Sequence, residues 1–283
     1  MSSAHAPGGM QLRVGFIGLG SQGGPMARAI VDAGFPTTLW ARRAASLEPY
    51  ADTAAAVAGS PAELGAASDL VCVCVVGDAD VEEVLLSDNG VLAGMSEGGI
   101  IAIHSTVSPD TCRRLAHEAQ SRGVSLIDAP VSGGAPAVAE RKLVVMVGGD
   151  ADVLQRCRPV FESYADPIVH LGELGSGQVT KLLNNLLFTA NLATAKATVT
   201  LAESLGVSID SLCEVLSRGS GNSAALASVA RLGGDLAVLS QVAGALLQKD
   251  VRHIVAIADQ RAVDPGAVLA AADSGLDALG HPR

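Results

Sequence analysis

The pattern of apolar residues changes abruptly near residue 175, and this change constrains the fold more than any other feature of the sequence. Between Leu12 and about His170, short runs rich in Val, Ile and Leu alternate with Ala-rich segments of helical pattern. Such alternation predicts parallel strands joined by crossover helices. Because helices cover both faces of such a sheet, its strands read as continuous apolar runs, here for example VGFI and LVCVCVV. The first half is therefore predicted to be a doubly wound α/β sheet.

The second half has the pattern of an all-α domain. The chain contains neither Gly nor Pro between Gly177 and Gly206. At about 1.5 Å per residue, a helix of roughly 30 residues would span about 45 Å, long enough to leave one domain and form the core of another. Further helices are predicted at 208–217, 222–232, 240–261 and 265–279. We expect a disordered leader in residues 1–10, a sheet domain in 11–174 and an all-helical substrate and oligomerisation domain in 175–283.

Composition excludes several classes of protein. The formal net charge of -10 and an aromatic content of 2% argue against a nucleic-acid partner, which needs basic patches and stacking platforms. With 49% hydrophobic and 17% charged residues, the chain is predicted to be globular, without a signal peptide or membrane span. Five scattered cysteines fit a reducing cytoplasm, and neither they nor the histidines have metal-ligand spacing. We expect no metal.

A glycine-rich turn follows the first predicted strand. Gly18, Gly20 and Gly23 form G-x-G-x-x-G directly after VGFI and directly before a helical pattern. In a Rossmann domain the first glycine permits a tight turn, the second lets the backbone approach a pyrophosphate, and the third lets the helix pack on the strand. A plain strand-to-helix turn is the alternative. We predict that residues 18–23 bind a dinucleotide, with Leu19, Ser21 and Gln22 in the same turn.

The end of the second predicted strand bears on cofactor choice. An acidic residue there would bind the ribose 2′-hydroxyl of NAD, but the chain reads Trp40, Ala41, Arg42 and Arg43. Two guanidiniums could bind the 2′-phosphate of NADP. The alternative is that both arginines are merely solvated. We predict NADP, held partly by residues 41–43, with NAD as the less favoured cofactor.

Several spaced segments, covering nearly the whole chain, resemble the β-hydroxyacid dehydrogenase family, which includes 3-hydroxyisobutyrate dehydrogenase and tartronate semialdehyde reductase. The resemblance implies a Rossmann domain and a helical domain joined by a long helix, with the active site in the cleft between the two domains. The matching stretches are GFIGLGSQGGPMA at 15–27, HSTVSPDT at 104–111, DAPVSGG at 128–134, MVGGD at 146–150, GSGQVTKLLNN at 175–185 and KDV at 249–251.

The resemblance also implies roles for individual residues. Lys181 matches the catalytic acid/base, Asn185 matches an asparagine that orients substrate, and Lys249 matches a further active-site lysine. The segment 132–134, Ser132-Gly133-Gly134, matches the carboxylate-binding turn. Lys181 and Asn185 are four residues apart, so a helix would place them on one face. Burial and the second cation would lower the pKa of Lys181, which suits proton transfer to an alkoxide.

Two further loops are candidates for cofactor contacts. Val76 lies in a loop after a predicted strand, where the family contacts cofactor, although Asp78 nearby could simply cap the next helix. Ser105 and Thr106 follow another strand, at the edge where such sheets bind ligands. An N-cap before Pro109 is their alternative. We also expect Lys249 near the cofactor.

The chain departs from the family pattern at several positions. Gln22 stands where relatives often have Met, and Arg141 lies near a position that is commonly Gly. Ala224 or Ala225 replaces a bulky aromatic, which would leave room for a larger substrate. The C-terminus is shorter than is usual in the family.

Together these features predict an NADP-dependent oxidoreductase that transfers a hydride between the nicotinamide and a small β-hydroxy acid or semialdehyde. Imine reductases resemble the same scaffold, but they generally have Asp or Tyr where this chain has Lys181. A non-catalytic NADP-binding protein is the third possibility, and it usually lacks that lysine. Since a long helix alone would expose apolar surface, we expect a homodimer or homotetramer through the helical domain.

Overall fold

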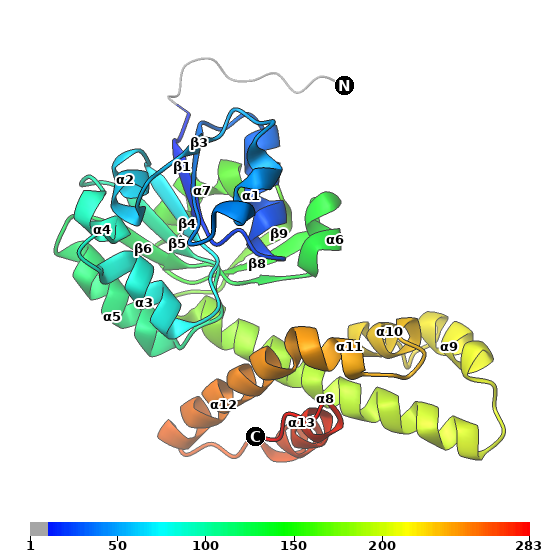
Figure 1. Ribbon diagram of the computed structural model, residues 1–283. Coiled ribbons are helices and arrows are strands. Elements are labelled where there is room, and N and C mark those ends of the chain that lie inside the picture. The colour runs from blue at the N-terminus through cyan, green and yellow to red at the C-terminus, as the bar shows by residue number, and fades with distance from the viewer. Residues whose placement is uncertain (1–10) are drawn as a thin grey trace. The chain divides into compact units, whose positions relative to one another are not determined.

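The computed structural model describes residues 11–283, which form two compact units. The first ends at Lys181 and the second runs from Leu182 to Arg283, so the division falls within the long helix α8 (Ser176–Ser204). Each unit has its own hydrophobic core. Figure 1 shows the strands, which all belong to the first unit, and the helices of both units. The leader expected in residues 1–10 lies outside the described residues.

The first unit is built on a six-stranded parallel sheet. The strand order is β3-β2-β1-β4-β5-β6, so the direction of winding reverses between β1 and β4. Ligands of open α/β sheets bind at the carboxyl ends of the strands at such a reversal. The predicted doubly wound, Rossmann-like sheet is confirmed. Its strands are β1 (Val14–Ile17), β2 (Thr37–Trp40), β3 (Ala56–Val57), β4 (Leu70–Val73), β5 (Ile100–Ile103) and β6 (Ser125–Asp128).

Helices cover both faces of this sheet, which explains why its strands are apolar at consecutive positions. Phe16 belongs to the core on one face and its neighbour Ile17 to the core on the other, because successive side chains of a strand point to opposite faces. The helices of this unit are α1 (Gly23–Asp32), α2 (Pro61–Ala66), α3 (Asp78–Leu86), α4 (Val91–Gly94), α5 (Pro109–Gln120), α6 (Gly134–Ala139) and α7 (Ala151–Phe161).

The last two apolar runs of this half do not extend the main sheet, contrary to the prediction of one continuous sheet. These runs form β8 (Leu143–Val147) and β9 (Ala165–His170), which pair in parallel within a separate three-stranded sheet. The third strand of that sheet is the short β7 (Val131–Ser132), which pairs antiparallel with β8. The connection from β7 to β8 contains only α6, and so short a connection suits an antiparallel return better than a parallel crossover. A single bridge between Asp128 and Gly148 links the two sheets.

The second unit is all helical, as predicted. Leu182, Leu186 and Val199 of α8 are buried in its core together with Val251 of α12 and Leu276 of α13. In the described chain, no helix combines the length and apolar character needed to cross a membrane. After α8 the elements are α9 (Ile209–Arg218), α10 (Ala224–Arg231), α11 (Ala237–Leu239), a π-helical turn (Ser240–Gly244), α12 (Ala245–Gln260) and α13 (Gly266–Ala278).

Candidate active site and cofactor-binding residues

The three glycines of the β1–α1 turn are required for different reasons. Gly18 has φ +98°, and a Cβ atom there would lie 2.0 Å from the carbonyl oxygen of Cys74. A Cβ atom at Gly23 would lie 2.0 Å from the carbonyl oxygen of Gly18. A Cβ atom at Gly20 would meet nothing within 4 Å. The protein itself therefore requires glycine at 18 and 23, whereas the bare backbone at Gly20 fits the close approach of an external group such as a pyrophosphate.

The N-terminus of α1 suits an anion. Its N-cap, Gln22, makes no side-chain capping hydrogen bond, and the first turn contains no acidic residue. The Gln22 amide instead reaches along the helix, with Nε2 3.6 Å from Sδ of Met26. The backbone N–H groups of the first turn and the helix dipole favour a negatively charged group at this end. These residues fit the phosphates of a dinucleotide.

Arg42 is held by acidic side chains of α3. Its Nη2 atom lies 2.8 Å from Oδ1 of Asp80, and Nη1 lies 3.8 Å from Oε2 of Glu83. Arg43 is exposed and precedes a short 3-10 turn. Val76, after β4, has 62% of its surface exposed. The second-strand end thus presents two exposed guanidiniums, of which one already has carboxylate partners.

Side-chain hydrogen bonds tie the loop after β4 to the loop after β5. Ser105 Oγ accepts a 2.8 Å bond from the N–H of Val75. Asp78 Oδ1 accepts bonds from the N–H of Ser108, at 2.8 Å, and from Oγ1 of Thr111, at 2.7 Å. Asp78 begins α3, but these two bonds run to the start of α5, whose N-cap is Ser108. Ser105 and Thr106 are therefore not that cap, and they lie where β5 leaves the sheet.

The turn at 132–134 needs its glycines. Gly133 has φ +130° and Gly134 has φ +70°, conformations that other residues rarely adopt. A Cβ atom at Gly133 would also lie 2.6 Å from Cβ of Ala137. Ser132 ends β7 immediately before them. Two successive glycines with positive φ make a turn of the kind that can direct backbone N–H groups at an anion, without charged side chains.

Helix α8 begins at the carboxyl edge of the main sheet. Asp128, the last residue of β6, is fully buried and accepts a 2.6 Å bond from the N–H of Gly175 and a 2.7 Å bond from that of Gln178. Burial raises the pKa of the Asp128 carboxyl, while these N–H donors act in the opposite direction. Lys181 follows Gln178 by three residues, so it lies within one turn of this attachment.

Asn185 and Lys249 are brought together by Asp250, within the second unit. Asn185 Nδ2 donates a 2.6 Å bond to Oδ2 of Asp250, and Nζ of Lys249 lies 3.1 Å from Oδ1. Asp250 is 3% exposed. Sequence reasoning identified the KDV stretch but assigned a role only to its lysine. Asp250 lies inside the KDV motif and Asp128 opens DAPVSGG, so these two motifs contained the sequence signal for both buried carboxylates.

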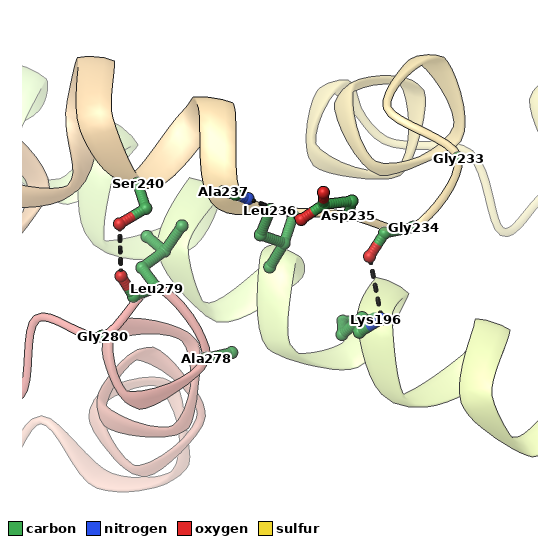
Figure 2. A pocket seen from close by; sticks show the side chains of 10 residues that line it. All are labelled: Lys196, Gly233, Gly234, Asp235, Leu236, Ala237, Ser240, Ala278, Leu279 and Gly280. Carbon is green, nitrogen blue, oxygen red and sulfur yellow. Dashed lines mark hydrogen bonds between the residues drawn. The ribbon is translucent and has the colours of Figure 1, made fainter.

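A pocket of about 630 Å³ lies elsewhere in the helical unit (Figure 2). Lys196 of α8 donates a 2.8 Å bond to the carbonyl oxygen of Gly234, and Ser240 donates one to that of Leu279, so backbone carbonyls hold its walls. None of the site residues predicted from sequence lines it. Among residues 11–283, no group of three or more His, Cys, Asp and Glu side chains could hold a metal ion.

The positions at which the chain departs from the family pattern lie in distinct environments. Arg141 has φ +56°, in the left-handed region that favours glycine. Ala224 begins α10, and Ala225 is buried in the helical core. A glycine at position 141 would adopt this backbone conformation without strain.

Two family models together match almost all of the described chain. The NAD binding domain of 6-phosphogluconate dehydrogenase matches residues 13–172, and the NAD-binding domain of NADP-dependent 3-hydroxyisobutyrate dehydrogenase matches residues 175–278. An NAD-dependent L-serine dehydrogenase of Pseudomonas aeruginosa is 35% identical over 215 residues, which are 76% of this chain and 72% of that protein.

Solved structures agree with these matches. A Mycobacterium tuberculosis 3-hydroxyisobutyrate dehydrogenase with L-serine has a TM-score of 0.81 at 29% identity, over 96% of this chain and 95% of that one. A Salmonella typhimurium 3-hydroxyisobutyrate dehydrogenase has a TM-score of 0.84 at 25% identity, over 94% of each chain. Two imine reductases are also structural neighbours, at 18% and 21% identity, and this likeness shows the fold alone.

Fold, glycine turn and family matches together define an NAD(P)-dependent oxidoreductase. The chain belongs to the β-hydroxyacid dehydrogenase family, and it is an NAD(P)-dependent β-hydroxyacid dehydrogenase.

Proposed function

We propose that the enzyme interconverts a small β-hydroxy acid and the corresponding semialdehyde or β-keto acid, with NADP as cofactor and Lys181 as general acid/base. The observation that carries this proposal is the attachment of α8 to Asp128 at the carboxyl end of β6. It fixes the turn of α8 that bears Lys181 to the sheet edge at which ligands of this fold class bind.

Each predicted site residue has a separate task in the proposed reaction. Lys181 Nζ gives a proton to the developing alkoxide oxygen during reduction and takes it from the hydroxyl group during oxidation. Asn185, held by Asp250, orients the substrate, and the turn at 132–134 binds its carboxylate through backbone N–H groups. The bound nicotinamide supplies the hydride chemistry. Positioning by these groups can contribute several orders of magnitude to the rate.

The phosphates of the cofactor fit the turn 18–23 and the N-terminus of α1. We propose that Arg42 and Arg43 bind the 2′-phosphate, for which Arg42 must exchange or share its partner Asp80. Replacing both arginines with Ala is expected to weaken NADP binding selectively. Equal losses for NADP and NAD, measured by fluorescence titration of the reduced cofactors, would contradict this preference.

Nicotinamide absorbance tests the reaction directly. Native protein, Lys181→Ala and the exposed surface control Lys142→Ala are compared with NADP(H) and a set of β-hydroxy acids, semialdehydes and cyclic imines. We expect turnover of a hydroxy acid or semialdehyde by the native protein and the control, with a loss of about 100-fold or more in Lys181→Ala. Imine reduction that survives in Lys181→Ala would favour the imine reductase alternative instead.

We further propose a homodimer or homotetramer formed through the helical unit. Leu183, Leu187 and Leu201 of α8, and Leu205 directly after it, are each at least half exposed, although they are large and apolar. A second copy covering them would remove this surface from water. Light scattering is expected to give at least twice the chain mass, and Leu201→Glu is expected to lower it. A monomeric native protein would contradict the proposal.

The five cysteines are unpaired, which supports a cytoplasmic location.

A further inference from the structure

Gln178 uses its buried side-chain amide to hold the loop after β5. Its Nε2 atom donates a 2.8 Å hydrogen bond to the carbonyl oxygen of Ser105, and its Oε1 atom accepts a 3.1 Å bond from the N–H of Val107. The residue is 0% exposed. Both bonds join positions more than 70 residues apart in the chain, 73 and 71 respectively. One side chain thus bonds to both sides of Thr106.

The backbone of the same residue is fixed from a second direction. Its N–H donates to Oδ2 of Asp128, whose other carboxylate oxygen accepts from Gly175. A Cβ atom at Gly148 would lie 2.5 Å from Oδ1 of Asp128, and one at Gly177 would lie 2.7 Å from Oδ2. These two glycines therefore let the carboxylate approach the start of α8 closely. The first turn of the helix has little room to shift.

We propose that Gln178 is a positioning residue that holds the loop 105–107 and the turn of α8 bearing Lys181 in one fixed register. This inference rests on the function proposed above, because it concerns the alignment of the proton donor with the nicotinamide-binding edge. Lys181 follows Gln178 by less than one helical turn, and Ser105 and Thr106 are predicted cofactor contacts. The side chain therefore connects the backbone carrying the proton donor directly to the backbone that faces the cofactor.

The chemistry of the side chain fits this task. A neutral amide offers an N–H donor group and an acceptor oxygen in a single plane, as a carbonyl and an N–H two residues apart require. An ionised carboxylate of the same shape could accept from Val107 but would face the carbonyl oxygen of Ser105 without a proton to donate. An alanine would leave both backbone groups unpaired inside the protein. Misplacement of a reacting group by about 1 Å can cost about 100-fold in rate.

The test compares Gln178→Ala and Gln178→Glu with native protein and with Gln155→Glu, a matched control at an exposed position of α7. For each protein, kcat is expressed per titrated NADPH-binding site, so that unfolded or cofactor-free molecules do not count. The primary isotope effect with NADPH deuterated at the transferred hydrogen is measured in parallel. We expect Gln178→Ala to lose about 100-fold in kcat per site with a larger isotope effect.

The Gln178→Glu variant is expected to show a pH dependence of kcat that a general loss of stability would not produce. When protonated, the introduced carboxyl can donate to Ser105 and accept from Val107 as the amide does. Burial raises the pKa of such a group, so we expect kcat per site to recover to within about tenfold of native near pH 6 and to fall toward the Ala variant by about pH 9. The Gln178 side chain also interacts with the buried thiol of Cys112, and Asp128, Asp78 and Arg113 act electrostatically on that thiol. These groups and Lys181 are present in the native protein as well, so the native pH profile is the reference for their titration.

The outcomes separate this inference from the proposed function. If the native protein turns over hydroxy acid but both Gln178 variants keep kcat per site within about threefold of native, the inference is wrong and the function stands. The same conclusion follows if the pH profile of Gln178→Glu parallels the native one. If Gln178→Ala does not fold, the pH profile of Gln178→Glu decides alone. Absence of native turnover on any hydroxy acid or semialdehyde removes the proposed function, and this inference with it.

Discussion

The side-chain amide of Asn185 donates a 2.6 Å hydrogen bond to the buried carboxylate of Asp250, 65 residues later in the chain. The same carboxylate is paired with Lys249 at 3.1 Å. A neutral and a cationic side chain, both assigned to the site by family resemblance, thus share one carboxylate. Asp250 fixes the orientation of the Asn185 amide, since Nδ2 of Asn185 donates to the Asp250 carboxylate while Oδ1 of Asn185 accepts from Asn184.

Removing Asp250 should therefore impair substrate handling. In Asp250→Ala, the Asn185 amide and Lys249 both lose this carboxylate, and we expect kcat/KM for the hydroxy acid to fall by about 10- to 100-fold. Binding of NADPH, followed by fluorescence, is expected to retain a native stoichiometry. Asp259→Ala, at an exposed position of the same helix, is the control. An unchanged kcat/KM in Asp250→Ala would show that this carboxylate has no part in catalysis.

The ion pair of Arg42 should restrain NADP binding. Asp80 competes with the 2′-phosphate for the guanidinium, so Asp80→Asn is expected to tighten NADP binding by about two- to fivefold without changing NAD binding. The gain should shrink at high salt, because the Arg42 side chain is 57% exposed. Titrations of NADPH and NADH at two ionic strengths check this, with Asp88→Asn, at an exposed position, as the control. A parallel change for both cofactors would place Arg42 away from the 2′-phosphate.

A buried histidine should make stability depend on acid pH. His104 Nδ1 lies 2.6 Å from the carbonyl oxygen of Ala129, and Nε2 lies 3.1 Å from the hydroxyl of Tyr164. Burial lowers the pKa of His104 from 6.5 to about 4. Since the folded state disfavours the cation, this stability is fully present above about pH 6.5 and is lost as the pH falls toward 4, amounting to about 3 kcal/mol.

Denaturant unfolding of native protein and His104→Asn between about pH 7 and 4 measures this contribution. Asn keeps an N–H donor for Ala129 but does not titrate, so its free energy of unfolding should fall less steeply with acid. Other groups, including Asp128, are common to both proteins and cancel in the difference. Parallel curves would mean that His104 has an ordinary pKa in the folded state.

Arg141 occupies a position suited to glycine. It follows the C-cap of α6, with its own N–H bonded to the carbonyl oxygen of Val138 and the next N–H bonded to that of Ala137. This is the Schellman arrangement, in which a left-handed residue ends the helix. We expect Arg141→Gly to raise the free energy of unfolding by about 1 kcal/mol in denaturant titrations. Arg141→Ala removes the same side chain but keeps the strained φ, so it should give no such gain; an equal gain would assign the effect to the side chain.

The sequence by itself determined the features that depend on local periodicity. Continuous apolar runs predicted the buried parallel strands, and the interval free of Gly and Pro predicted α8. The glycine spacing after β1 predicted the tight turn, because the steric conflict at Gly23 is with the carbonyl oxygen of Gly18, inside a strand-turn-helix unit that the pattern already defines. These features can be predicted from the sequence because each depends on residues that are close together in the chain.

The tertiary structure alone decided which distant groups meet. The bond from Val107 to Gln178 and the ion pair of Arg42 with Asp80 depend on how separate strands and helices pack, and no local pattern marks those partners. The second sheet formed for the same reason: β8 is as apolar as the strands of the main sheet, but its short connection from β7 directs it into an antiparallel pair. Residue type and spacing in the sequence identify the candidate reactive side chains, whereas hydrogen bonds between segments remote in the chain determine the position of each one in the folded protein.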